Sequence, residues 1–451
     1  MKKLFIILLL VFIITGCSNT TDLDELMVVM EEHIIIADRV DEDVDLPLEI
    51  IFQNETYDVI WESLNEDVMD RYGHIYQKDE DVMVTLKATV KTNRATYTMT
   101  FEVKVMKKEN PNPFVKTHQY VKYASHLDSS RFNQLKLEND KLIIHDDHIQ
   151  GSYESEVIEA SLFKKMVGSW AATTNMDATV ELQVRVMVDG QWSKYLSYRP
   201  WGFEKQNFSF NTTDDIARIA IDEIIVLNDK KAEKFQYKVI LKRLNINIDS
   251  PKLDLISFAL TIDDYSYKPN VEDLPNFIDY EVPMLNQQAV SEIGSSICSP
   301  TSAAMLLLYK GHDLYKKDEL PHRYTAALFK DYGANIYGNW VFNTVGMSSF
   351  NEKAYVGMMY SFEELMRHLE EVGPVAASVS GDMGVYQTGG HLIVIRGYRI
   401  TDDGDIFVLA NDPNINSRFG NDDEGNPLFV YYEFPLETFM NTWKGIVYII
   451  E

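Results

Sequence analysis

Long stretches in which apolar and polar residues alternate constrain the fold of this chain more than any other feature. The segments Val82–Val90, Tyr97–Val105 and Ala178–Val188 follow this pattern. Successive side chains of a β-strand point to opposite faces, so such a segment predicts a strand with one buried face. Asp189-Gly190 directly follows the third segment and predicts a hairpin turn. We therefore expect most of the first two thirds of the chain to be all-β.

Two β-rich regions follow from the spacing of these strands. The first covers 45–107 and the second 115–275, with the polar, proline-containing run Lys107–Pro113 as a linker. We predict a small β-sandwich for the first region and a larger, jelly-roll-like β-sandwich for the second. The order of Val59-Ile-Trp-Glu-Ser63 and Phe101-Glu-Val-Lys-Val105 resembles the bacterial immunoglobulin-like domains of surface proteins. That resemblance implies a spacer role for the first region.

Net charge argues against one class of partner. The chain of 451 residues has 69 acidic and 42 basic residues, and its formal net charge is −27. This excess of negative charge repels phosphate backbones, so we expect no nucleic-acid partner.

The N-terminal residues indicate export. Met1-Lys-Lys3 is followed by the apolar run Leu4–Ile14 and then by Thr15-Gly-Cys17. The run is shorter than the roughly 20 residues of a membrane-spanning helix and is typical of a secretory signal. Its ending resembles the bacterial lipobox, which implies that residues 1–16 are a lipoprotein signal peptide and that the cysteine is acylated. We therefore expect a lipid anchor at the extracellular side of the cell membrane, with residues 17–44 as a tether and short helix.

The chain has two cysteines, Cys17 and Cys298. If Cys17 carries lipid, Cys298 is a lone thiol outside the cell, where an unpaired thiol is prone to oxidation. This makes Cys298 a functional candidate, with a small buried hydrophobic residue as the alternative. Two cysteines cannot form a multi-cysteine metal site, and we expect neither a metal nor an organic cofactor.

The residues after Cys298 predict a helix over 299–310. Pro300 suits a first helical turn, and Gly311 suits the position after a helix ends. Cys298 would then lie at the helix N-terminus, where the helix dipole and unpaired N–H groups stabilise a thiolate and an oxyanion. A further helix is expected over 361–372, followed by strands after residue 374.

A thiolate nucleophile needs a base, and the C-terminal region has four histidines. His312 lies at the far end of the predicted helix, and His322 follows Pro321 in a polar loop. His368 lies on a charged helix, where we expect it to be solvated. His391 follows Gly389-Gly390 and begins an apolar strand. Glycines here allow close approach of a substrate, so His391 is the preferred base.

Asp412 is the candidate that orients His391. A hairpin with a four-residue loop over Thr401–Gly404 places Asp412 opposite Ile393, diagonal to His391 on the same face. A two-residue turn keeps the same facing, and diagonal neighbours lie roughly 7–8 Å apart. The alternative is that Asp412-Pro413 merely ends a strand.

Two other groups of residues admit more than one interpretation. An aromatic cluster beside one strand of the second region is best explained by a core with aromatic edges, with a sugar-stacking patch as the alternative. It comprises Trp192, Tyr195, Tyr198 and Trp201. Asp146, Asp147 and His148 are best explained by an exposed turn, with metal contact as the alternative.

The C-terminal residues together resemble the bacterial C39-like cysteine peptidases. The resemblance rests on Val282-Pro283, Cys298-Ser-Pro-Thr-Ser302, Gly338-Asn-Trp-Val-Phe-Asn-Thr344, Gly373-Pro-Val375, Gly390-His-Leu-Ile-Val-Ile-Arg-Gly397 and Asn411-Asp-Pro413, in this order. It implies an α+β papain-like fold over 280–451. It also implies Cys298 as nucleophile, His391 as base and then acid, Asp412 as its orienter, and Gln287 as an oxyanion-hole donor. Gln288 is adjacent and stays open as an alternative, and Ser299 stands where many relatives have glycine.

These inferences lead to one expected function and two alternatives. We expect a surface-anchored cysteine hydrolase that cleaves peptide or related amide bonds through a Cys-His-Asp triad and a thioester. Its partners would be a peptide or protein substrate, the membrane through the lipid anchor, and the cell wall. The rival is a non-catalytic adhesin or scaffold lipoprotein whose C39-like domain binds peptide without cutting it. A weaker alternative is a carbohydrate-binding lipoprotein, which rests only on the aromatic cluster.

Overall fold

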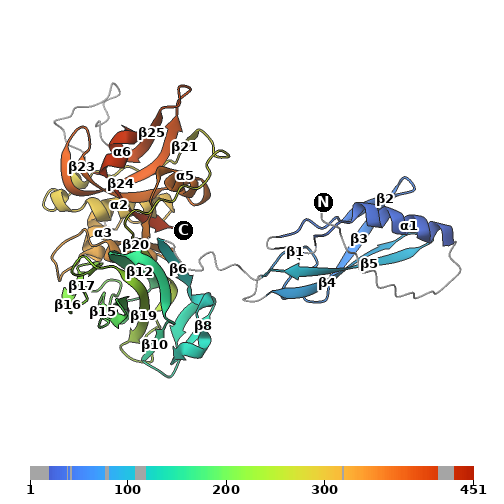
Figure 1. Ribbon diagram of the computed structural model, residues 1–451, viewed down its shortest axis with the longest axis horizontal. Coiled ribbons are helices and arrows are strands. Elements are labelled where there is room, and N and C mark those ends of the chain that lie inside the picture. Colours follow the sequence, from blue (N-terminus) through green and yellow to red (C-terminus); the bar gives the residue numbers. More distant parts are fainter. Residues whose placement is uncertain are drawn as a thin grey trace. The chain divides into compact units, whose positions relative to one another are not determined.

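The computed structural model describes residues 20–37, 39–40, 43–76, 81–106, 118–316, 319–414 and 431–451. The predicted signal peptide and Cys17 lie outside these residues. The chain divides into two compact units, Met1–Pro113 and Phe114–Glu451, each considered by itself below (Figure 1). Within the described residues, no helix has the length and apolar character needed to cross a membrane.

Within its described residues, the first unit consists of one sheet and one helix. The strand order is β1-β5-β4-β3-β2, with β1 parallel to β5 and the other pairs antiparallel. The elements are α1 (Thr20–His33), β1 (Arg39–Val40), β2 (Glu49–Phe52), β3 (Glu55–Ser63), β4 (Val82–Lys91) and β5 (Thr96–Val105).

Helix α1 belongs to the core of this unit. Leu26, Met30 and Ile34 are buried in the same cluster as Trp61 and Leu86. A sheet with one apolar face needs a second layer, and here a helix supplies it. The predicted two-sheet sandwich over 45–107 therefore differs from the structure, which shows one sheet covered by a helix among the described residues. The prediction placed a tether and short helix in residues 17–44 but treated them as separate from the β-rich region, so it missed the shared core.

The second unit begins with two sheets. The first has the order β14-β13-β19-β10-β7, with β11 paired to β19 and β15 paired to β13. The second has the order β16-β17-β18-β12-β20-β9-β8, with β6 paired to β20. The first sheet comprises β7 (Phe132–Asn133), β10 (Gln150–Glu154), β11 (Ile158–Phe163), β13 (Ala178–Val188), β14 (Gln191–Trp192), β15 (Leu196–Ser197) and β19 (Ala232–Arg243). The second comprises β6 (Gln119–Tyr123), β8 (Leu135–Glu138), β9 (Lys141–Ile144), β12 (Lys165–Thr173), β16 (Thr212–Thr213), β17 (Ala217–Ala220), β18 (Glu223–Val226) and β20 (Lys252–Thr261). Two short 3-10 helices follow β6, η1 (Ala124–His126) and η2 (Ser129–Arg131).

The aromatic cluster predicted in this region divides into two pairs. Tyr198 and Trp201 are buried in the hydrophobic core that the two sheets share. Trp192 and Tyr195 lie at the sheet surface, where the Arg185 guanidinium sits 4.6 Å and 5.0 Å from their ring centroids. This division fits a core with an aromatic edge, because an arginine already lies over the rings that a sugar would need.

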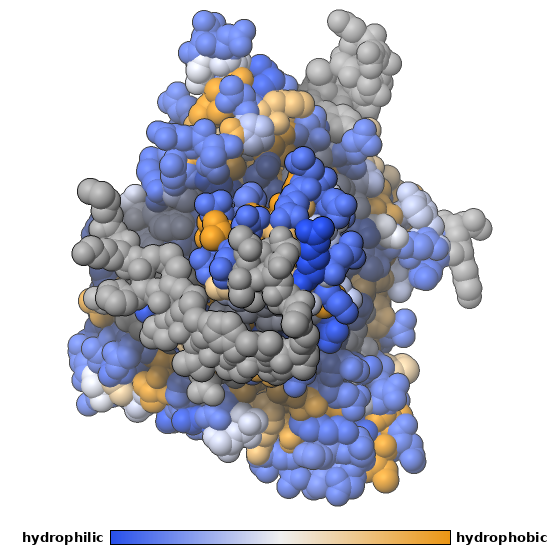
Figure 2. All heavy atoms as spheres, turned by 90° about the vertical axis from the view of Figure 1, so that its right-hand side faces the viewer, coloured by the Kyte–Doolittle hydropathy of each residue, from blue (hydrophilic) through white to orange (hydrophobic). Residues whose placement is uncertain are grey.

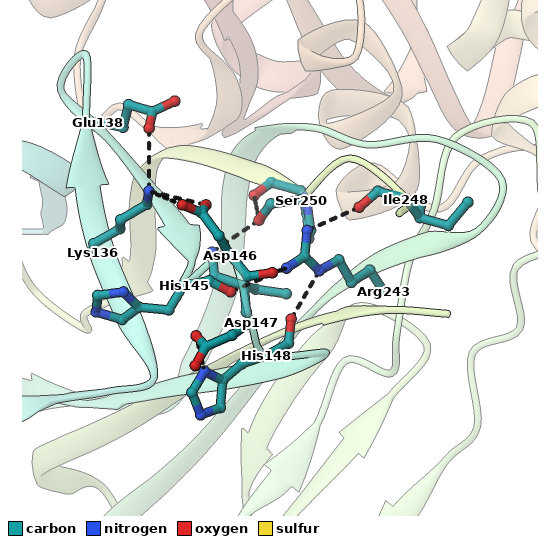
Figure 3. Close-up of polar contacts among 11 residues, drawn as sticks. Lys136, Glu138, His145, Asp146, Asp147, His148, Arg243, Ile248 and Ser250 are labelled. Atoms are coloured by element: carbon teal, nitrogen blue, oxygen red, sulfur yellow. Dashed lines mark hydrogen bonds and ion pairs between the residues drawn. The ribbon is translucent and has the colours of Figure 1, made fainter. Parts of the chain in front are cut away.

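The cluster of Asp146, Asp147 and His148 lies in a turn whose backbone is hydrogen-bonded by one arginine. The guanidinium of Arg243 donates to the carbonyl oxygens of His145, Asp146, His148 and Ile248 at 2.7–3.0 Å (Figure 3). The Asp146 carboxylate pairs with Lys136 and the Asp147 carboxylate with His148 instead of converging on a common point. Among the described residues, no group of three or more histidine, cysteine, aspartate and glutamate side chains is arranged to hold a metal ion.

The C-terminal region adds a third sheet with helices. Its strand order is β22-β27-β23-β24-β25-β26, with β21 paired to β24. The strands are β21 (Phe277–Asp279), β22 (Ala354–Met358), β23 (Val375–Asp382), β24 (Gln387–Ile400), β25 (Ile406–Asn411), β26 (Tyr431–Pro435) and β27 (Trp443–Ile450). The helices are η3 (Gln287–Ala289), η4 (Gly294–Ser296), α2 (Cys298–Tyr309), α3 (Pro321–Phe329), α4 (Trp340–Ser348), α5 (Phe362–Glu371) and α6 (Leu436–Thr442). The helices predicted over 299–310 and 361–372 are confirmed as α2 and α5, while α3, α4 and α6 were not predicted.

Helices cover both faces of this sheet. Leu392 and Val394 of β24 pack into one cluster with α2, whereas Ile393 and Ile395 pack into another with α5 and α6. Figure 1 shows β23, β24 and β25 side by side in the orange part of the ribbon. A strand buried on both faces reads as a continuous apolar run, which explains why residues 392–395 show no alternation.

The C-terminal region and the two preceding sheets share one hydrophobic core. Val341, Phe342 and Val345 of α4 belong to the same buried cluster as Trp170 of β12 and Phe258 of β20. The second unit is therefore continuous from the strands of the middle region to the helices of the C-terminal region.

Strand β22 is an edge of the third sheet, and side chains of the second sheet bond its backbone. Ser169 accepts a hydrogen bond from the N–H of Val356 at 3.0 Å. Gln119 accepts from the N–H of Met358 at 2.8 Å and donates to the Val356 carbonyl at 3.3 Å. Open strand edges tend to pair with other chains, so these contacts protect the edge.

On the face that Figure 2 shows, hydrophilic residues predominate and hydrophobic ones form small separate patches.

Candidate active site

Cys298 is the first residue of α2, as its neighbours predicted. The helix is apolar and buried from Ser299 to Leu307, and Gly311 follows its end with a φ of +88°. The residue as a whole is half-buried, and its thiol lies at a helix N-terminus. This is the environment in which a thiol loses its proton most readily.

His391 and Asp412 meet across the β24–β25 hairpin. The Nε2 atom of His391 lies 2.7 Å from Oδ1 of Asp412, and both side chains are buried. This bond leaves the other ring nitrogen, Nδ1, for Cys298. The structure thus brings together the three residues that the sequence singled out.

A bulge in the hairpin makes this meeting possible. Near the turn, Ile400 pairs with Ile406 and Gly397 with Leu409, and the register shifts before Ile395 pairs with Ala410. Side chains alternate in facing along a strand, so without the shift Asp412 would face away from His391. The predicted loop of four residues is therefore not the one observed, although the predicted facing at Asp412 is correct.

Asp412 has two further donors that the sequence analysis did not identify. The Tyr386 hydroxyl donates to Oδ2, and the N–H of Asn414 donates to Oδ1 at 2.8 Å. The Tyr386 ring also contacts the His391 ring edge-on, with centroids 6.0 Å apart. Tyr386 lies in the turn between β23 and β24, and only the hairpin brings it to Asp412.

The protonation of the pair favours an ion pair. Burial by itself raises the pKa of the Cys298 thiol, but the hydrogen bond and charge of His391 outweigh it, helped by the backbone N–H groups of Leu392 and Ser299. The net result is a thiol pKa below its ordinary value of 9.0. Burial lowers the pKa of His391, but the charge and hydrogen bond of Asp412 and the contact with Cys298 raise it to about 10. Between these two pKa values the pair exists as thiolate and imidazolium.

Gln287 lies in η3, buried next to the same site. Its Nε2 atom donates to the Gly294 carbonyl at 2.6 Å, four residues before Cys298. Its backbone N–H donates to the Pro413 carbonyl at 2.8 Å, which ties η3 to the end of β25. The neighbouring Gln288 is exposed. These positions favour Gln287 over Gln288, and its role as oxyanion donor stays a prediction.

The other three histidines of this region, His312, His322 and His368, have different surroundings. The Nε2 atom of His312 lies 2.5 Å from a carboxylate oxygen of Glu352. His322 is buried in the first turn of α3 and not in a polar loop, and burial lowers its pKa. His368 was expected to be solvated, but it is half-buried on α5, and burial lowers its pKa to about 4. Ser299 lies behind the site, with its hydroxyl 2.7 Å from that of Tyr448.

Comparison with known families agrees with this geometry. Residues 280–449 match the model described as the Peptidase_C39 like family. The chain carries a C39-like peptidase domain at its C-terminus. Residues 125–261 match the Peptidase C39 N-terminal domain, and residues 22–108 match the atrophied bacterial Ig domain. The immunoglobulin-like match includes α1, in agreement with the shared core of that unit.

Solved structures and curated proteins add little to the C39-like assignment. A crystal structure described as a C39-like peptidase from Bacillus anthracis is 18% identical, with a TM-score of 0.27, over 39% of this chain and 98% of that one. A structure of CBM51-2 in complex with GlcNAc and INT domains from Clostridium perfringens ZmpB is 10% identical, with a TM-score of 0.14, over 88% of this chain and 98% of that one. At these scores neither structure bears on the fold. No curated protein matches the chain.

Proposed function

We propose that this protein is a cysteine peptidase that hydrolyses peptide or related amide bonds through Cys298, His391 and Asp412. The observation that carries the proposal is the bond from His391 to Asp412 at 2.7 Å, with Cys298 beside His391 at the start of α2. A charged thiol, a general acid and base, and a group that orients it are what acyl transfer requires.

The proposed reaction has two halves. The Cys298 thiolate attacks the amide carbonyl carbon, and the oxygen becomes an oxyanion that faces the N-terminus of α2, with Gln287 as a second donor. The His391 imidazolium gives its proton to the leaving nitrogen, so an amine departs and a thioester remains. Water then attacks the thioester, His391 takes a proton from that water, and the carboxylic acid leaves as the thiolate re-forms.

The rival function is binding of a peptide without cleavage. The geometry supports catalysis because burying His391 with Asp412 has an energetic cost that a binding surface has no need to bear. A charged pair in the interior is stabilised only where its partners are well placed. Such strongly shifted pKa values are concentrated at catalytic sites.

The test is thiol labelling of purified protein with iodoacetamide across pH, comparing the wild type with His391→Ala. We expect labelling of Cys298 that is fast well below pH 9 and that slows at least tenfold at pH 7 in the variant. Circular dichroism checks that the variant is folded. An ordinary thiol titration, unchanged by the substitution, would sink the proposal and leave the binding role.

The proposed location is the extracellular side of the cell membrane, held by lipid on Cys17. The support is the sequence alone, namely the apolar run Leu4–Ile14 and the lipobox-like ending. Membrane fractionation of cells that express the wild type or Cys17→Ser tests it. We expect the variant to leave the membrane fraction, and retention of both forms there would argue against the lipid anchor.

A further inference from the structure

A cavity lies on the β23–β24 hairpin next to the candidate base. It has a volume of about 360 Å³ and is lined by Gly381, Asp382, Gln387, Thr388 and Gly389. In β24, Gly389 is two residues from His391, which corresponds to about 7 Å along a strand. The size lies within the range of ligand pockets, about 300–1,000 Å³. A substrate held at His391 would therefore extend over this cavity.

The glycines beside His391 have no packing reason to be glycine. A Cβ atom added to Gly389 or Gly390 would meet nothing within 4 Å, and neither residue has a positive φ. By contrast, a Cβ on Gly397 of the same strand would lie 1.8 Å from the Ile278 carbonyl oxygen. Gly389, which lines the cavity, and Gly390 beside it thus leave open space next to His391, which is room for a ligand.

The cavity is polar and carries one carboxylate. Asp382 is exposed, and its Oδ1 atom accepts the N–H of Gly384 at 2.9 Å. Among the described residues, no lysine, arginine or histidine forms an ion pair with Asp382. The side chains of Gln387 and Thr388 add hydrogen-bonding groups on the paired strand, because Asp382 pairs with Gln387 and Gly381 with Thr388. Polar walls and an unneutralised carboxylate favour a cationic group over an apolar or acidic one.

We propose that this cavity is a substrate subsite that takes a lysine or another amine-bearing side chain of the peptide. The inference rests on the proposed function, because it places the substrate at His391. Asp382 pairs with Gln387 across the hairpin. Gln387 precedes His391 by four residues, about 13 Å in extended chain, so the amine-bearing residue lies within four residues of the cleaved bond. The ammonium group pairs with Asp382, and the peptide backbone passes over Gly389 and Gly390.

Binding measured without turnover tests the subsite. The probes are three sets of octapeptides, identical except that the scanned position holds lysine, norleucine or glutamate. Their affinity is measured by fluorescence anisotropy with the Cys298→Ala variant, which cannot form a thioester. We expect lysine peptides to bind about tenfold more tightly than norleucine peptides, and glutamate peptides to bind most weakly.

Two further substitutions in this variant locate the preference. Asp382→Asn keeps an oxygen for the Gly384 N–H, and we expect the preference for lysine to fall below about twofold. Asp402→Asn is the matched control, because it removes one exposed charge at the other end of β24, and the preference should persist. Gly389→Ala should weaken the binding of all three peptide sets about equally and leave the melting temperature of the protein unchanged.

Each outcome separates this subsite from the proposed function. Equal binding of lysine and norleucine peptides, no binding of any set, or a lysine preference that survives Asp382→Asn would overturn the subsite. A preference for lysine that depends on Asp382, found together with ordinary thiol labelling of Cys298, would support the subsite but contradict the proposed peptidase function. Fast, His391-dependent labelling without a lysine preference would do the reverse.

Discussion

At the scale of single residues, the Asp412 carboxylate is the most heavily bonded group of the site. His391, Tyr386 and the N–H of Asn414 all donate to it. A carboxylate with several donors is fixed in its direction, and this keeps the His391 ring in place. Two predictions follow, one about the geometry of this group and one about its charge.

Replacement of Tyr386 by phenylalanine removes one donor from Asp412 while keeping the ring beside His391. A single hydrogen bond to a charged group contributes about 1.5–3 kcal/mol, so we expect kcat to fall by roughly tenfold or somewhat more, with KM little changed. Steady-state kinetics on any cleaved peptide measures this, with the iodoacetamide labelling rate as a second readout. Unchanged kcat in a folded variant would mean that Tyr386 does not position Asp412.

The charge of Asp412 sets the pH range in which the enzyme works. Below the Cys298 pKa the sulfur is a neutral thiol, and above the His391 pKa of about 10 the ring has no proton to donate. We expect a bell-shaped dependence of kcat/KM on pH. Asp412→Asn keeps the shape of the side chain but removes the charge that raises the pKa of His391. The alkaline limb should therefore move to lower pH and the acid limb to higher pH, which a pH series of kcat/KM measures. Limbs that stay in place would show that the charge does not control the pair.

At the scale of elements, the two ends of strand β24 have different surroundings. One end passes close to β21 at Gly397, and the other end is open at Gly389 and Gly390. The bulge between Ile395 and Gly397 lies between these ends and sets the facing of His391 relative to Asp412. The two ends of β24 thus differ in how closely they are packed.

Alanine substitutions at the two ends of β24 should behave differently. Gly397→Ala puts a methyl group 1.8 Å from the Ile278 carbonyl, so we expect a loss of stability on the order of 3 kcal/mol and a clear drop in melting temperature. Gly390→Ala, the matched change, should leave the melting temperature within about 1 °C. Thermal unfolding by calorimetry measures both. Equal effects of the two substitutions would contradict the assignment of packing to one end and open space to the other.

At the scale of the whole molecule, the C39-like peptidase domain is not independent of the region before it. Helix α4 shares a core with β12 and β20, and the edge of β22 is bonded by Ser169 and Gln119. A buried carboxylate and a half-buried one add polar links. Asp331 accepts from Ser209 and Asn339, and Asp222 accepts from the N–H of Trp340. Separation of the two regions would expose an apolar helix face and an open strand edge.

Truncation tests this dependence. We expect residues 280–451 alone to be insoluble or unfolded, whereas residues 114–451, a compact unit, should fold and keep the labelling rate of Cys298. Circular dichroism and the iodoacetamide labelling rate of the two fragments provide the measurement. A folded 280–451 fragment with a reactive thiol would show that the shared core is dispensable.

Some features of this protein were set by local sequence. Strand alternation, helix ends and the position of Cys298 depend on residues a few places apart, because backbone geometry fixes which neighbours share a face. These signals predicted α2, α5 and many of the strands, and they singled out His391 and Asp412. The C39-like resemblance brought Gln287, which the residues alone did not identify.

Other features were decided only by the tertiary structure. Three of these features join residues that are distant in sequence: the contact of Tyr386 with Asp412, the packing of α1 in the first core, and the core shared by α4 and β12. The fourth is the bulge in β24, which depends on a shift of one residue in the strand register. A periodic pattern shows that a face must be buried but not which element covers it. Such a pattern also does not reveal a bulge of one residue, because close packing against the neighbouring strand determines where the bulge lies.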